Sequence, residues 1–116
     1  MVRVSGLRSR RKGHNYEREL ARLFKKHFPH LDIKRGLGQV RGGDQGPDVD
    51  MPMFWIEAKR HLRCNVKAAL RQAVTDSSAD KQERIPVAIC KNDREEYASV
   101  SMRLDDFVII LEKLLP

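Results

Sequence analysis

Residues 46–59 read GPDVDMPMFWIEAK, and this stretch decides the fold because it predicts two neighbouring strands joined by a tight turn. The first strand covers residues 48–51, and the second covers residues 53–59. Side chains alternate along a strand, so Glu57 and Lys59 are expected to share one face. The other face is apolar and is expected to join the core: Phe54, Ile56 and Ala58.

The elements on either side follow from periodicity and from turn-forming residues. Apolar residues recur at helical spacing in three segments, and short apolar runs predict further strands. In chain order we expect a helix at 14–28, a strand at 31–34, a glycine-rich loop at 36–47, the two strands above, a helix at 65–79, strands at 86–90 and 97–101, and a helix at 104–115. This order predicts an α/β fold with a mixed central sheet flanked by helices, in one domain from residue 13 to residue 116.

The composition is that of a globular domain with a heavily charged surface. The chain has 116 residues, enough for one small core, and 41% of them are apolar, which excludes disorder throughout. The net charge is +7, and a basic domain attracts polyanions, of which nucleic acid is the commonest. No run of about 18 apolar residues exists, so no membrane-spanning helix is expected.

Residues 1–12 are strongly basic and contain no acid. We expect a flexible N-terminal arm here, which either binds phosphates or is a solvated tail. Its cations are Arg3, Arg8, Arg10, Arg11 and Lys12. No apolar signal-peptide segment follows, and neither cysteine has zinc-site spacing, so a reducing, cytoplasmic setting is expected.

The two predicted strands bring Asp48 and Glu57 together. Two carboxylates at one point repel each other and raise each other's pKa unless a cation lies between them. Magnesium is the natural cation, because it takes oxygen ligands and keeps waters and substrate phosphate oxygens. Lys59 beside this pair would orient a water or stabilise charge on a phosphate. Alternation by itself favours the alternative, a solvated charged face.

Glu17 falls on the apolar face of the first predicted helix. An acid on a buried face is costly unless it has a partner, which a metal, a lysine or an arginine would supply. The alternative is an acid placed at the start of a helix, where the helix dipole favours it.

Three segments together resemble the PD-(D/E)XK nuclease superfamily. They are KGHNYEREL at 12–20, GPDVD at 46–50 and WIEAK at 55–59. The first is similar to the opening of archaeal-type Holliday-junction resolvases, in which a glycine precedes a helix carrying an acid followed by arginine. Two later segments, IPVAICKND and MRLDDF, are similar to phage or prophage members. The resemblance implies a restriction-endonuclease-like sheet.

The resemblance also implies roles for individual residues. Lys59 corresponds to the catalytic lysine, and Asp48 is preferred over Asp50 because it directly follows proline. The implied metal ligands are Glu17, Asp48 and Glu57, and we also expect Ala58 to take part. The implied DNA contacts are Arg18 and either Arg35 or Arg41, and we also expect contacts from Arg10, Arg11, Lys12 and Arg60. Either Arg35 or Arg41 matches the loop arginine of the resolvases, because the loop differs in length.

We therefore expect a Mg²⁺-dependent endonuclease, with Mn²⁺ as a substitute, that resolves four-way DNA junctions by paired nicks. The alternatives are the same chemistry on flaps, ends or duplex, and a DNA-binding module without catalysis. Symmetric resolution implies a homodimer. The segment 104–115 is apolar nearly all round, which indicates either a helix buried against a partner or a terminal helix packed within the chain.

Overall fold

A computed structural model describes residues 2–36 and 46–116. The sheet has five strands in the order β1-β2-β3-β4-β5. They are β1 (Lys34–Arg35), β2 (Val49–Asp50), β3 (Phe54–His61), β4 (Ile85–Asn92) and β5 (Ser99–Ser101). Only β3 and β4 are parallel, and every other neighbouring pair is antiparallel. The long central pair supplies most of the sheet, since the outer strands have only two or three residues.

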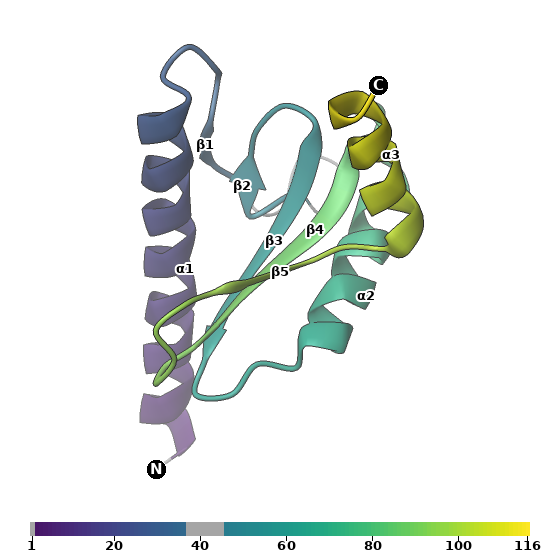
Figure 1. Cartoon of the computed structure of the whole chain (residues 1–116). Helices are drawn as coiled ribbons and strands as arrows, with labels where there is room; N and C mark the ends of the chain where they lie inside the picture. Colours follow the sequence, from purple (N-terminus) through teal and green to yellow (C-terminus); the bar gives the residue numbers. More distant parts are fainter. Residues whose placement is uncertain (1, 37–45) are drawn as a thin grey trace.

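Helices cover both faces of this sheet, as Figure 1 shows. Helix α1 (Val2–His27) packs on one face, where a core cluster includes Leu20, Val49 and Ile56. Helix α2 (Val66–Ser77) forms the crossover between β3 and β4 and packs on the other face against Ala88 and Cys90. Helix α3 (Leu104–Leu114) follows the edge strand β5. The expected α/β fold with a mixed sheet flanked by helices is confirmed.

The element order is as expected, and most bounds shift by only a few residues. The first helix is the exception, because it begins at Val2 rather than at residue 14. The segment predicted as an arm, residues 1–12, is therefore helical from residue 2 onward and continuous with the predicted helix. These residues contain no proline, and arginine, leucine and lysine favour helix. An ion pair of 2.6 Å from Lys12 to Asp93 also ties this part of α1 to the end of β4.

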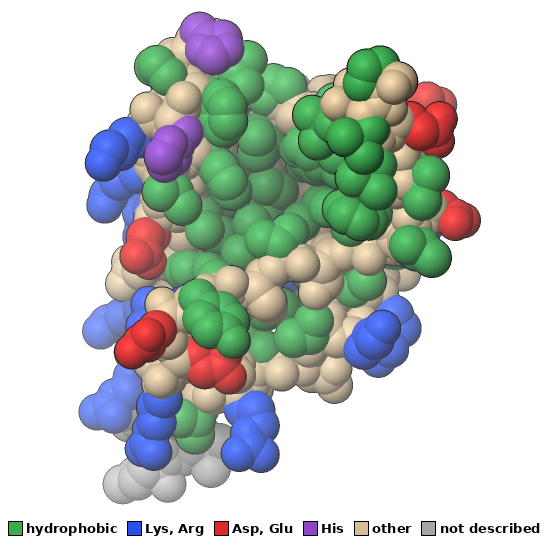
Figure 2. Space-filling model, in the orientation of Figure 1, with side chains coloured by type: hydrophobic (Ala, Val, Ile, Leu, Met, Phe, Trp, Pro, Cys, Tyr) green, Lys and Arg blue, Asp and Glu red, His purple; other side chains and the backbone are tan. Residues whose placement is uncertain are grey.

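Helix α3 leaves its apolar side chains largely exposed. Its only buried residue is Asp106, which accepts a hydrogen bond from Arg103. The exposed apolar residues at this end of the chain are Leu104, Phe107, Val108, Ile109, Leu114 and Leu115. Figure 2 shows apolar side chains gathered in the hollow between α1 and α3. The expectation that this helix is buried on more than one side is not met within a single chain.

Over residues 2–36 and 46–116, no helix is both long enough and apolar enough to cross a membrane.

Candidate metal centre and DNA-facing pocket

Asp48, which directly precedes β2, is fixed by its own backbone and by its side chain. Its backbone N–H donates to Ile56 O (2.8 Å), and its carbonyl accepts from the N–H of Gly36 (2.8 Å). One carboxylate oxygen accepts a hydrogen bond from the backbone N–H of Ala58 at 2.8 Å. The carboxylate is therefore held against the middle of β3, beside the residue that follows Glu57.

Glu57 is a buried acid in the centre of the sheet. The residue is 2% exposed, and its carboxylate accepts a hydrogen bond from the indole N–H of Trp55 at 3.4 Å, a long contact. Burial and the neighbouring Asp48 carboxylate raise the pKa of Glu57 to about 8. An acid with this environment retains its proton near neutral pH unless a cation compensates its charge.

Glu17 approaches the same carboxylate from α1. Its carboxylate pairs with Arg35 Nε of β1 at 3.3 Å. An arginine is therefore the partner of this acid on the apolar helix face. Burial and the nearby Asp48 raise the pKa of Glu17 to about 7, although Arg35 opposes this shift. Asp48 thus lies between two acids, one on each of the elements that flank it.

The strand face carrying Glu57 also carries Lys59, as predicted. In the parallel register Glu57 pairs with Ala88 and Lys59 pairs with Cys90, and both partners belong to the cluster beneath α2. Ile56 and Ala58 belong to the cluster beneath α1. The alternation read from the sequence is therefore confirmed, and the acid of this face is buried rather than solvated.

The two aspartates of the GPDVD segment have different surroundings. Asp50 pairs with Arg84 Nη1 at 2.7 Å, and Arg84 also pairs with Asp80 at 3.0 Å. The Arg84 guanidinium lies 5.3 Å from the centre of the Trp55 ring. Asp50 is thus occupied by a structural ion pair, which supports the preference for Asp48 at the site.

A small pocket of about 200 Å³ opens between α1 and β3. Glu17, Asp48, Ala58 and Lys59 line its wall, whereas the buried Glu57 does not. The other lining residues are Arg10, Gly13, His14, Arg60 and His61. Four of the predicted site residues therefore meet at one cavity, and two predicted DNA contacts flank it.

Sequence reasoning did not assign three of the lining residues to the site. His14 and Gly13 precede Glu17 on α1, and His61 follows Lys59 by two residues on β3. The signals were present, because His14 lies three residues before Glu17 in a helix and His61 shares the strand face of Lys59. They were not decisive, since exposed histidines are common.

The predicted DNA contacts are distributed over several surroundings. Arg60 and Lys12 both pair with Asp93, at 3.5 and 2.6 Å. Arg18 is exposed and donates to the Asn15 side chain at 3.1 Å, and Arg11 is exposed. Arg41 lies outside the described residues, so the choice between Arg35 and Arg41 stays open even though Arg35 contacts Glu17.

The donor set suits a hard, oxygen-preferring cation. Glu17 and Glu57 lie near Asp48, and burial, followed by the charge of Asp48, raises the pKa of both acids. Within residues 2–36 and 46–116, no group of three or more His, Cys, Asp or Glu side chains is arranged to enclose a metal. Magnesium does not need such a cage, because one or two carboxylates suffice when water and phosphate supply the other ligands.

Comparison with protein-family models finds no match for this chain, and neither curated proteins nor solved structures provide one.

Proposed function

We propose that the protein is a Mg²⁺-dependent endonuclease of the PD-(D/E)XK type, with a restriction-endonuclease-like sheet, that cuts DNA phosphodiesters. The observation that carries the proposal is the Asp48 carboxylate held against Ala58, with Glu57 and Lys59 on either side of that residue in β3. A domain that only binds DNA gains nothing from acids facing phosphate. The net charge of +7 provides affinity for the polyanion.

The side chains divide the work. Asp48 and Glu57 would hold Mg²⁺ together with Ala58, and Glu17 would complete the acidic set. When bound, this cation supplies polarisation of a phosphoryl oxygen and a water of lowered pKa. Lys59, which lines the same pocket, places its ammonium group where charge develops on the phosphate. Arg10 and Arg60 at the rim attract the DNA backbone.

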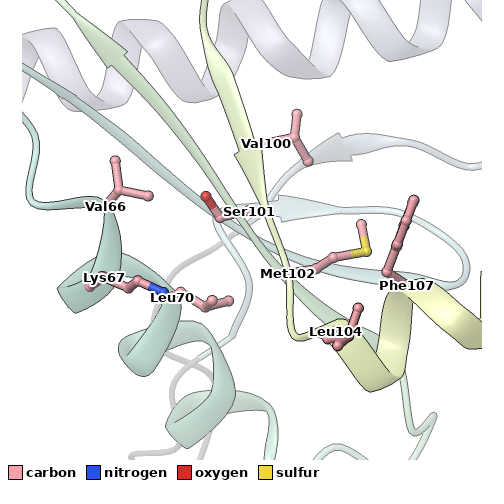
Figure 3. A pocket seen from close by; sticks show the side chains of 8 residues that line it. All are labelled: Val66, Lys67, Leu70, Val100, Ser101, Met102, Leu104 and Phe107. Atoms are coloured by element: carbon pink, nitrogen blue, oxygen red, sulfur yellow. The ribbon is translucent and has the colours of Figure 1, made fainter.

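The substrate we propose is a four-way junction, bound by a homodimer. The exposed apolar face of α3 is the feature that supports association, since contiguous exposed apolar surface marks interaction sites. It continues into a groove of about 680 Å³ between α2, β5 and α3. Figure 3 shows Leu70 of α2, Met102 between β5 and α3, and Phe107 of α3 around this groove. A two-fold dimer would present two active sites to a symmetric junction.

A direct comparison of substrates tests this proposal. A labelled four-way junction and a linear duplex of matched sequence are incubated with the protein, with Mg²⁺ or with EDTA. We expect cleavage only with Mg²⁺, faster on the junction, with paired nicks on opposing strands seen on a denaturing gel. Equal rates on both substrates would move the proposal to a general nuclease. No cleavage of any DNA with Mg²⁺ or Mn²⁺ would leave only a DNA-binding module.

A further inference from the structure

Gly13 stands inside a long helix without a reason in the protein's own packing. It lies midway along α1, where glycine stabilises a helix less than alanine does. Among residues 2–36 and 46–116, no atom beyond the adjoining helix backbone lies within 4 Å of a Cβ atom built on Gly13, and the Gly13 backbone is not in the left-handed region. Gly36 behaves differently, because a Cβ there would lie 1.7 Å from Pro47 O. The fold therefore requires glycine at position 36 but not at position 13.

The open space over Gly13 belongs to the pocket described above. Gly13 is part of the lining, with Arg10 and His14 beside it on α1 and with Arg60 and His61 across from it on β3. Two arginines and two histidines thus surround a stretch of helix backbone that has no side chain. Glu17 and Asp48 line the same pocket, so this basic part lies in one cavity with the acidic part.

Arg60 is the lining cation that the structure ties to another element. Asp93, just after β4, accepts from Arg60 at 3.5 Å and also from Lys12, outside the lining, at 2.6 Å. Arg60 is thereby linked to the residue that follows β4 while it still lines the pocket. A stretch of bare helix backbone with arginines beside it suits a phosphate group that is part of a longer chain.

We propose that Gly13, Arg10, His14, Arg60 and His61 form a phosphate-binding subsite for the DNA strand, at a phosphate next to the one that is cut. Gly13 leaves room for the sugar-phosphate chain, and Arg60 and Arg10 supply the charge. The inference rests on the proposed nuclease function, in which Asp48 lies at the scissile phosphate. It adds Gly13 to the residues that determine where the DNA strand lies.

Substitutions that fill the space test the subsite in the full chain. The variants are Gly13→Ala, Gly13→Leu and Gly13→Gln, with Thr75→Ala on exposed α2 as a control that also raises helix propensity outside the pocket. Binding of a labelled junction is measured by fluorescence anisotropy in EDTA, so that no cleavage intervenes. Circular dichroism and Tm report whether each variant is folded.

We expect Gly13→Ala and Thr75→Ala to raise Tm, because both improve helix propensity without a clash. Affinity should fall about threefold for Gly13→Ala and about tenfold or more for Gly13→Leu, as for a lost phosphate contact. Thr75→Ala should bind as the wild type does. If Gly13→Leu is unfolded, Gly13→Gln replaces it in the binding test, since glutamine also fills the space and favours helix.

A double-mutant cycle with Arg60→Gln sharpens the test. Each of Gly13→Leu and Arg60→Gln should reduce the salt dependence of binding by about one unit of slope, because each loses the same phosphate. The double variant should then bind only as weakly as the weaker single variant. Additive losses, or folded Gly13→Leu and Gly13→Gln variants that bind within twofold of the wild type, would overturn the subsite.

The outcome can be separated from that of the proposed function. If the wild type cuts DNA and Asp48→Asn does not, but the folded Gly13 variants bind as the wild type does, only the subsite fails. If no DNA is cut with Mg²⁺ yet the Gly13 variants lose affinity as expected, the nuclease proposal fails and the phosphate-binding subsite stands as part of a DNA-binding surface.

Discussion

At the scale of single residues, the Glu57 carboxyl group lies where its charge is disfavoured. It is buried, it lies near Asp48, and it accepts a long hydrogen bond of 3.4 Å from the Trp55 indole N–H. Its pKa is raised from 4.5 to about 8, so the folded protein retains a proton that the unfolded chain releases near pH 4.5. Binding of the proposed metal would therefore be coupled to release of this proton.

The raised pKa of Glu57 predicts that the stability of the metal-free protein depends on pH. Between pH 4.5 and about 8 the folded state binds more protons than the unfolded state, so the free energy of unfolding of the metal-free protein falls as pH rises through this window. Glu17, whose pKa is raised to about 7, acts in the same direction. In EDTA, Tm should fall from pH 5 to pH 8, and Glu57→Gln should flatten this decline.

Added Mg²⁺ or Mn²⁺ should stabilise the wild type more at pH 8 than at pH 6, because the ligands must be deprotonated. The Glu57→Gln variant should respond less to the metal. Identical pH profiles of Tm for the wild type and Glu57→Gln would contradict the assigned environment of Glu57.

The sequence could predict which residue types meet at the site, but not every contact that selects among them. Asp48, Glu57 and Lys59 followed from strand alternation and the tight turn between two strands. The role of Asp50 depends on Arg84, which is 34 positions away and reaches Asp50 only after the chain has folded. The ion pairs of Asp93 with Lys12 and Arg60 could not be predicted for the same reason, because they too join distant parts of the chain.

At the scale of elements, the short strand β1 and the start of β2 position Asp48. Gly36 follows β1, and its N–H donates to the carbonyl of Asp48 at 2.8 Å. The two backbones approach so closely that a Cβ at position 36 would lie 1.7 Å from Pro47 O. The close approach at Gly36 therefore helps to fix the position of Asp48 relative to β3.

Gly36→Ala should consequently destabilise the fold by about 1–3 kcal/mol, because backbone must move to accept the new methyl group. The shift falls on residues 47–48, so the metal-induced rise in Tm should also shrink. Thermal unfolding with and without Mg²⁺ checks both effects, and Gly13→Ala provides the matched glycine control without a clash. A Gly36→Ala variant with wild-type Tm would contradict the close approach.

Patterns of apolar residues made most helices and strands predictable, whereas the N-terminal bound of α1 was harder to predict. The VAIC run gave β4 and the spacing around Ala69 and Ala73 gave α2, because burial on the sheet imposes these patterns. The N-terminal extension of α1 carries no apolar stripe of that kind. Its charges suggested an arm, whereas its helix-favouring composition and the link from Lys12 to Asp93 accompany a continuous helix.

At the scale of the whole molecule, α3 exposes apolar surface that one chain does not cover. Phe107, Val108 and Ile109 are 45%, 42% and 44% exposed. If this surface is the dimer interface, a charge introduced on it is left without a partner in a dry contact. The double variant Val108→Lys/Ile109→Glu should therefore be monomeric at low micromolar concentration, where we expect the wild type to be dimeric.

Sedimentation or light scattering measures this directly, with Leu62→Lys as an exposed apolar control away from α3. The monomeric variant should still bind DNA but should lose the pairing of nicks on opposing strands. A monomeric wild type at these concentrations would contradict the dimer.

The most direct test of the central claim compares two neighbouring aspartates in one assay. Asp48→Asn and Asp50→Asn are incubated with a labelled four-way junction and Mg²⁺, after circular dichroism has shown both to be folded. We expect Asp48→Asn to lose cleavage by about a thousandfold, as for the loss of several kcal/mol of metal-dependent stabilisation, while it still binds the junction. Asp50→Asn should keep most of its activity at a lower Tm, because Asp50 serves the ion pair with Arg84. Wild-type cleavage by Asp48→Asn, or loss of cleavage in a folded Asp50→Asn alone, would contradict the account.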